Sequence, residues 1–139
     1  MKLSGIVETA LYVDDVPRAR DFYKKLFNLD TLGEDDPTGR FAALDVAHGS
    51  VLLFFKKGAT TTPLPLPGGI IPPHDGTGQL HYAFGIAAAD YEGWKSRLMD
   101  HGVAIESEVT WPRGGISLYF RDPEGNLGEL ITPNVWQNY

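Results

Sequence analysis

The 139-residue chain contains no cysteine. Disulfide bonds, thiolate nucleophiles and cysteine-type zinc sites are therefore excluded together. Positive charge is also scarce, because 12 Lys and Arg residues stand against 18 Asp and Glu residues and the formal net charge is −6. An acidic chain repels phosphate backbones, so we expect no nucleic-acid partner.

Long apolar runs are missing as well. No stretch approaches the roughly 20 apolar residues that a membrane-spanning helix needs. The first residues, Met1 to Gly5, lack the apolar segment of a signal peptide. We therefore expect a cytoplasmic protein without a membrane partner. A chain of this length suits one domain, or two small half-domains that share a core.

The first half of the chain, residues 4–58, predicts a strand, a helix and then further strands. Residues 5–13 form the first strand candidate, and Asp15 before Pro17 is typical of a helix start. The helix that follows carries one apolar stripe: Ala19, Phe22, Tyr23, Leu26 and Phe27. Two short apolar runs, residues 41–46 and 50–55, predict a hairpin. A third strand is expected if part of residues 31–39 also pairs.

Residues 59–78 separate the two halves. They hold five of the chain's 10 prolines together with four glycines, so they cannot form a helix or an inner strand. Two interpretations stand, a plain linker and a lid or binding loop, because long loops in small domains often bind ligands. For His74, within this segment, we expect a solvated position.

The second half, residues 79–133, repeats the order of the first. A strand over residues 80–86 leads into a helix, for which Asp90 can act as cap and Gly102 as the end. The helix stripe contains Tyr91, Trp94, Leu98 and Met99. A short strand over residues 103–108 and a hairpin around the turn at residues 121–125 follow. The repeat predicts an internally duplicated domain that covers residues 1–139.

The strand over residues 80–86 carries an unusual face. His81 shares that face with Ala83 and Gly85, which leave space beside the imidazole. Aligning the two halves places Glu8 opposite His81. The simpler interpretations are a core histidine with satisfied hydrogen bonds and a half-exposed strand glutamate.

Glu129 lies in the middle of the last apolar strand. A buried carboxylate is costly unless it is paired, hydrogen-bonded or bound to a metal. Its counterpart in the first half, near Leu53, is apolar. Together with Glu8 and His81 it forms an O/O/N set suited to a divalent ion. The alternative is a salt bridge from Glu129 to Arg121 or Arg113.

Four segments resemble the vicinal oxygen chelate superfamily, which is also called the glyoxalase, bleomycin-resistance and extradiol-dioxygenase superfamily. They are Glu8–Asp15, Arg20–Tyr23 with Leu26, His81–Ile86 and Tyr119–Leu130. The resemblance covers nearly the whole chain, and residues 81–90 are especially similar to fosfomycin-resistance thiol transferases. It implies an α+β fold of two tandem βαβββ modules whose sheets curl into a cup around one divalent metal ion (Mn, Fe, Co, Ni, Zn or Mg).

The resemblance also implies metal ligands at Glu8, His81 and Glu129. Members of this length commonly form homodimers, in which Glu8 comes from the same chain or from its partner. Around this site we expect Tyr119 to hydrogen-bond the substrate, with core packing of its ring and a solvated hydroxyl as the alternative. Glu8 or Glu129 is expected to act as a base. The other candidates for substrate contact are Trp111, Arg113, Arg121 and Phe55. For the loop at residues 111–115, an ordinary surface turn is the alternative.

Departures from the family pattern leave the reaction open. Fosfomycin enzymes and extradiol dioxygenases carry a histidine where this chain has Glu8, and residues 132–139 lack the basic tail of the fosfomycin enzymes. We expect a metal-dependent lyase, isomerase or thiol transferase that acts on a small substrate with adjacent oxygens. The alternatives are a metal-free protein that sequesters small molecules, as in bleomycin resistance, and an extradiol-type dioxygenase.

Overall fold

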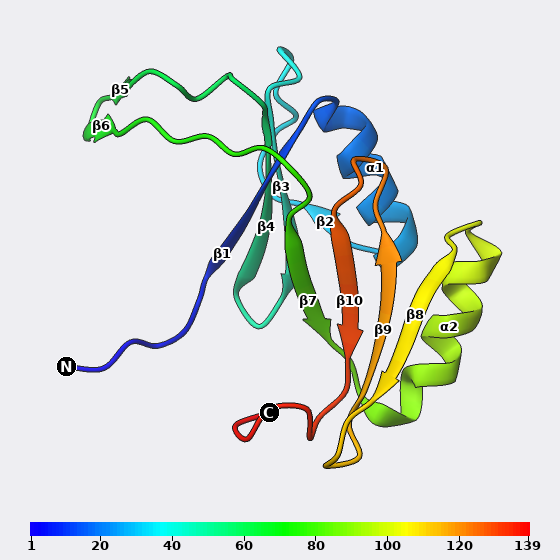
Figure 1. Cartoon of the computed structure of the whole chain (residues 1–139). Coiled ribbons are helices and arrows are strands. Elements are labelled where there is room, and N and C mark those ends of the chain that lie inside the picture. Colours follow the sequence, from blue (N-terminus) through cyan, green and yellow to red (C-terminus); the bar gives the residue numbers. More distant parts are fainter. The chain divides into compact units, whose positions relative to one another are not determined.

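Two four-stranded sheets, each with its own helix, organise the chain (Figure 1). The computed structural model describes residues 1–139, which divide into a first unit, Met1–Gly78, and a second unit, Gln79–Tyr139. Residues 59–78 belong to the first unit. None of the helices has the length and apolar character needed to cross a membrane.

The first unit has the strand order β1-β4-β3-β2. Strand β1 runs parallel to β4, whereas β3 is antiparallel to both β4 and β2. A separate two-stranded hairpin, β5-β6, lies within the proline-rich segment. The elements are β1 (Glu8–Val13), α1 (Val16–Phe27), β2 (Asp30–Thr31), β3 (Phe41–Ala47), β4 (Ser50–Lys56), β5 (Leu64–Leu66) and β6 (Gly69–Ile71).

The second unit has the equivalent strand order, β7-β10-β9-β8. Strand β7 runs parallel to β10, and β9 is antiparallel to both β10 and β8. The elements are β7 (His81–Gly85), the 3-10 turn η1 (Ala88–Asp90), α2 (Tyr91–Asp100), β8 (Ile105–Thr110), β9 (Ile116–Arg121) and β10 (Leu127–Ile131). The predicted α+β fold of two βαβββ modules is thus confirmed.

The registers fix which residues of the two units correspond. In the first unit Ala10 of β1 lies opposite Leu53 of β4. In the second unit Ala83 of β7 lies opposite Glu129 of β10. Glu129 therefore occupies the position of Leu53, as the alignment of the two halves predicts.

The helix ends follow the sequence only in part. Asp15 caps α1 by accepting the backbone N–H of Arg18 at 2.9 Å. Asp90 precedes α2 but makes no such side-chain bond, because a 3-10 turn already occupies residues 88–90. The predicted stripe of α2 is wrong at Met99, which is 58% exposed. His101 is the last helix cap, and Gly102 follows it in the left-handed region at φ 69°.

Gly128 shows how closely the second core is packed beside Glu129. A Cβ atom at this position would lie 2.3 Å from the ring of Phe120, which is fully buried. We expect Gly128→Ala to lower the free energy of unfolding by about 2 kcal/mol, because the added Cβ would force the buried ring of Phe120 to shift. Urea denaturation measures this change.

A matched control lies in the same unit. Gly93 sits in α2 with no atom within 4 Å of an added Cβ. Gly93→Ala is expected to stabilise the protein by about 0.5–1 kcal/mol, because alanine favours the helix. Equal effects of the two substitutions would contradict the close approach at Gly128.

Candidate metal centre and pocket

The centre of the second unit is a contact between His81 and Glu129. The Nε2 atom of His81 lies 3.3 Å from Oε2 of Glu129. Glu129 is only 5% exposed, whereas half of the His81 side chain is open to solvent. Strands β7 and β10 bring the two residues together because they pair in parallel and both side chains project from one face.

The second ring nitrogen of His81 determines what Nε2 can do. Its Nδ1 atom lies 3.1 Å from the backbone oxygen of Leu127. A carbonyl oxygen can only accept, so Nδ1 carries a proton and donates it. In a neutral imidazole, Nε2 then directs a lone pair at the Glu129 carboxylate, which also has only lone pairs to offer. That arrangement is favourable only when a proton or a metal cation lies between the two groups.

Tyr119 lies opposite Glu129 in the β9-β10 pair. Burial raises the pKa of its hydroxyl and a hydrogen bond with Ser117 opposes this effect, while the negative charge of Glu129 and a hydrogen bond to that carboxylate raise the pKa further. The phenol therefore stays protonated at neutral pH and can donate a hydrogen bond on this face. Its ring centre lies 6.4 Å from that of His81.

The two arginines predicted as salt-bridge partners of Glu129 are engaged elsewhere. Arg121 contacts Glu106 through Nε at 2.7 Å, and Arg113 donates to the backbone oxygens of Asn134 and Val135. The predicted salt bridge from Glu129 to Arg121 or Arg113 is therefore wrong, and the basic side chain that lies beside Glu129 is His81. These contacts also occupy the guanidinium groups of both predicted substrate ligands, whose roles toward a substrate stay predictions.

Trp111 is hydrogen-bonded to Ser117, a neighbour of Tyr119 in β9. Its Nε1 donates to Oγ of Ser117 at 2.8 Å, and its backbone N–H closes a turn with Gly115. Ser117 also forms a hydrogen bond with Tyr119. The Ser117 hydroxyl therefore links the indole of Trp111 to the phenol of Tyr119, which lies beside Glu129. The turn at residues 111–115 thus helps to hold Ser117 and Tyr119 in position beside Glu129.

Tyr139 fills space that the sequence suggests is vacant. A Cβ atom at Gly85 would lie 2.3 Å from the Tyr139 hydroxyl. That hydroxyl is 3.4 Å from the backbone oxygen of Ile131. The expectation of free space beside Gly85 is therefore wrong, whereas Ala83 remains exposed. No sequence motif marks Tyr139, because its contact depends on how residues 132–139 fold back.

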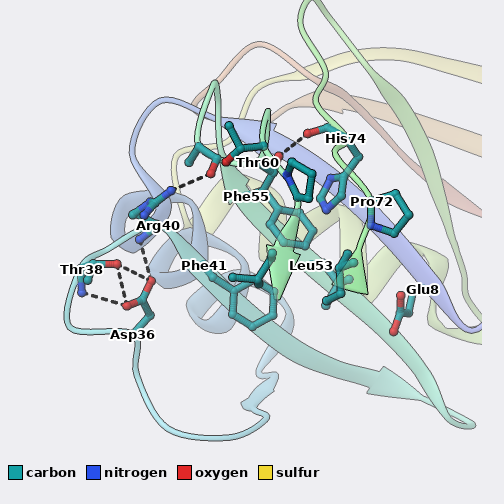
Figure 2. A pocket seen from close by; sticks show the side chains of 15 residues that line it. Glu8, Asp36, Thr38, Arg40, Phe41, Leu53, Phe55, Thr60, Pro72 and His74 are labelled. Atoms are coloured by element: carbon teal, nitrogen blue, oxygen red, sulfur yellow. Dashed lines mark hydrogen bonds between the residues drawn. The ribbon is translucent and has the colours of Figure 1, made fainter. Parts of the chain in front are cut away.

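Glu8 lies in the first unit, at the edge of a cavity of about 720 Å³ (Figure 2). Leu53, Phe41 and Phe55 form its apolar side. Glu8 begins β1 as His81 begins β7, so the two residues hold equivalent places in their units. Phe55, a predicted substrate contact, is in this cavity and not in the second unit.

Proline-rich residues 59–78 form much of the cavity wall. Eight of the fifteen lining residues come from this segment: Ala59, Thr60, Thr62, Pro63, Leu64, Ile71, Pro72 and His74. The plain-linker interpretation is therefore wrong. His74 is half-buried, and its Nδ1 lies 2.7 Å from the hydroxyl of Tyr12, so the expectation of a solvated histidine is also wrong.

The predicted metal set is divided between the units. His81 and Glu129 belong to the second unit and Glu8 to the first. Within each unit, no group of three or more His, Asp or Glu side chains is arranged to hold a metal ion. A site built from all three residues stays a prediction.

The chain belongs to the Glyoxalase/Bleomycin resistance protein/Dioxygenase superfamily, because the model of that family matches residues 5–130. The resemblance seen in the sequence is confirmed. Among curated proteins, no match is found.

Solved structures add similar relatives. A lactoylglutathione lyase from Agrobacterium tumefaciens is 31% identical with a TM-score of 0.87, over 99% of both chains. An integron cassette protein of V. Cholerae is 26% identical with a TM-score of 0.72, over 96% of this chain and 98% of that one. The fosfomycin resistance protein FosX from Listeria monocytogenes, 19% identical with a TM-score of 0.67 over 96% and 97%, is alike in fold.

Proposed function

We propose that the protein is a divalent-metal-dependent enzyme whose metal is held by His81 and Glu129, with Glu8 as the third ligand. The observation that carries this proposal is the 3.3 Å contact between Nε2 of His81 and Oε2 of Glu129, two atoms that can share one cation. The Nδ1 contact to the Leu127 carbonyl supports it, because metal-binding histidines commonly donate their other N–H to such a group.

The donor types fit a divalent ion of the Mn, Fe, Co, Ni, Zn or Mg group. An imidazole nitrogen with carboxylate oxygens is an ordinary ligand set for these metals. Three protein ligands also leave coordination positions open, as catalysis requires. When bound, such an ion supplies Lewis-acid polarisation of substrate oxygens and stabilises developing negative charge.

The third ligand is assigned to Glu8 by equivalence. Glu8 and His81 are the first residues of the first strand in their respective modules. We propose that Glu8 reaches the pair either from the same chain or from the second subunit of a homodimer. Mixing Glu8→Gln and Glu129→Gln subunits tests the dimer version, since one intact site per mixed dimer would restore part of the metal binding.

The remaining residues bind and orient the substrate. The Tyr119 phenol, kept protonated by burial, donates a hydrogen bond to a substrate oxygen. Glu8 or Glu129 accepts the proton of the reacting carbon. We propose lyase or isomerase chemistry on a small substrate with adjacent oxygens. Thiol transfer is less favoured, because the relative at 31% identity is a lyase and the lactoyl group in its name has a hydroxyl next to a carbonyl.

Metal analysis of the purified protein tests this function. We expect about one divalent ion per chain and a lower melting temperature after chelation. A ligand at 100 times its Kd stabilises the folded state by about 2.7 kcal/mol, so restoring the metal should raise the melting temperature clearly. Protein that contains no ion and does not respond to chelator or to added metal would exclude the proposal.

A metal-free sequestering protein is the second candidate, and the aromatic cavity of the first unit favours it. Phe41, Phe55 and Leu53 offer an apolar surface without a catalytic cluster. This function requires ligand-dependent stabilisation in the presence of chelator, unchanged by Glu129→Gln.

A further inference from the structure

We propose that Tyr139 limits the length of the substrate that the second unit accepts, because its phenol closes one end of the sheet face that carries His81 and Glu129. The inference deepens the proposed function and rests on it, since it places the substrate on that face. It assigns compact substrates with a short substituent to the site.

The strand registers divide this face into rows of residues that lie opposite one another in β7, β10 and β9. The first row contains the buried carboxylate and its neighbours: Ala83, Glu129 and Tyr119. The second row lies two residues further along β7: Gly85, Ile131 and Ser117. Residues two apart on a strand share a face, so both rows belong to the face of Glu129.

Two aromatic side chains cover the second row. The Nε1 atom of Trp111 donates to Oγ of Ser117 at 2.8 Å. The hydroxyl of Tyr139 lies where a side chain of Gly85 would begin, since an added Cβ would be 2.3 Å from it. Under this cover Ile131 and Ser117 are only 5% and 0% exposed. A molecule that extends along β7 from the first row therefore meets the phenol.

Residues 132–139, the tail that carries Tyr139, are fastened to the turn before β9. Arg113 donates through Nε and Nη2 to the backbone oxygens of Asn134 and Val135, at 3.3 and 2.5 Å. The backbone N–H of Asn134 donates to the backbone oxygen of Tyr139 at 2.7 Å. Figure 1 shows the tail, in red, at the ends of β7 and β10. A barrier held by these bonds does not need a ligand to order it.

The spacing of the rows sets the length limit. Two residues of a strand span about 6.6 Å, which is the distance along β7 from Ala83 to Gly85. Van der Waals contact with the phenol takes up about 3.5 Å of this length. A substrate whose adjacent oxygens lie beside Glu129 can therefore extend toward Tyr139 by about two carbon atoms. Long acyl chains that run along β7 are excluded.

Hydroxamates test this limit, because they carry two adjacent oxygens that chelate a divalent ion. Acetohydroxamate and octanohydroxamate form the test pair, titrated by calorimetry into protein loaded with Ni²⁺, which binds such sites more tightly than Mn²⁺, Fe²⁺ or Co²⁺. We expect the wild type to prefer acetohydroxamate by at least about 10-fold, the effect of forcing atoms into filled space. Tyr139→Ala should remove this preference, whereas Tyr139→Phe, which keeps the ring, should retain most of it.

Trp136→Ala is the matched control. Trp136 lies in the same tail, and 64% of its surface is exposed. Its substitution should leave the preference for the shorter hydroxamate unchanged. Arg113→Ala, which loosens the tail, should shift the preference in the direction of Tyr139→Ala.

A second measurement needs neither metal nor hydroxamate. The backbone at Gly85 accepts alanine, because its φ is not positive. Gly85→Ala should lower the urea midpoint of the wild type, since the added Cβ displaces the phenol. In the Tyr139→Ala background the same substitution should leave the midpoint unchanged or raise it, because glycine weakens a strand. Tyr139 is 43% exposed, so Tyr139→Ala leaves the core intact.

The outcomes separate the role of Tyr139 from the proposed function. Equal preference in the wild type and Tyr139→Ala, or additive effects of Gly85→Ala and Tyr139→Ala on the midpoint, would overturn the role of Tyr139 and leave the metal site standing. Wild-type protein that takes up neither Ni²⁺ nor another divalent ion would overturn the proposed function, and the length limit with it.

Discussion

Glu129→Gln is expected to lower the affinity for the divalent ion by at least about 100-fold and to leave the metal-free fold as stable as the wild type. Loss of an outer-sphere partner alone costs about 10- to 100-fold in metal affinity, so loss of a ligand should cost no less. The glutamine amide can donate to the lone pair on Nε2 of His81, which removes the opposition between two acceptors. Metal titration calorimetry and urea denaturation measure the two quantities.

The stability measurement separates a metal ligand from a structural carboxylate. Removing the charge of a buried carboxylate that is paired within the fold lowers the free energy of unfolding by several kcal/mol. Removing the charge of a buried carboxylate that has no partner changes the free energy of unfolding little. Glu106→Gln is the matched control, because it removes an exposed carboxylate that pairs with Arg121 in the same unit. Strong destabilisation by Glu129→Gln together with unchanged metal affinity would assign Glu129 to the core.

The two-module fold could be predicted because each module repeats a local pattern. A strand, a capped helix and alternating strands are set by short-range spacing, and the repeat after Glu8 recurs after His81. Even the correspondence of Leu53 with Glu129 follows from aligning the halves, and the registers confirm it.

The site was less predictable because it depends on contacts between distant segments. The tautomer of His81 is set by a carbonyl of another strand, at Leu127. His74 lies in a segment whose prolines exclude regular structure, yet Tyr12, 62 residues away, holds it. The position of Tyr139 over Gly85 depends on a tail without periodicity. Composition and spacing carry no information on such pairings.

The turn between β9 and β10 can be predicted from its own residues, and it also makes a long-range contact that positions the site. The buried Asp122 accepts hydrogen bonds from the backbones of Glu124 and Asn126 at 2.9 and 2.8 Å and from the Asn126 amide at 2.9 Å. Asn126 in turn accepts the backbone N–H of Leu80 at 3.0 Å. Because Leu80 precedes His81, this turn network aligns the start of β7 with β10.

Asp122→Ala is therefore expected to lower the free energy of unfolding by about 3 kcal/mol, since it removes three hydrogen bonds and leaves buried donors unsatisfied. For a chain of this length the melting temperature should fall by about 10 °C. Asp100→Ala, which removes an exposed carboxylate at the end of α2, should change stability by less than about 0.5 kcal/mol. Thermal and urea denaturation of both variants measure the difference.

The same substitution tests how the turn acts on the site. Without Asp122 the Asn126 side chain is free to rotate away from Leu80, so His81 loses its fixed distance to Glu129. Folded Asp122→Ala protein should then bind the divalent ion more weakly, by about 10- to 100-fold as for other supporting residues. Unchanged metal affinity in a destabilised variant would show that β7 and β10 hold His81 and Glu129 in place without the turn.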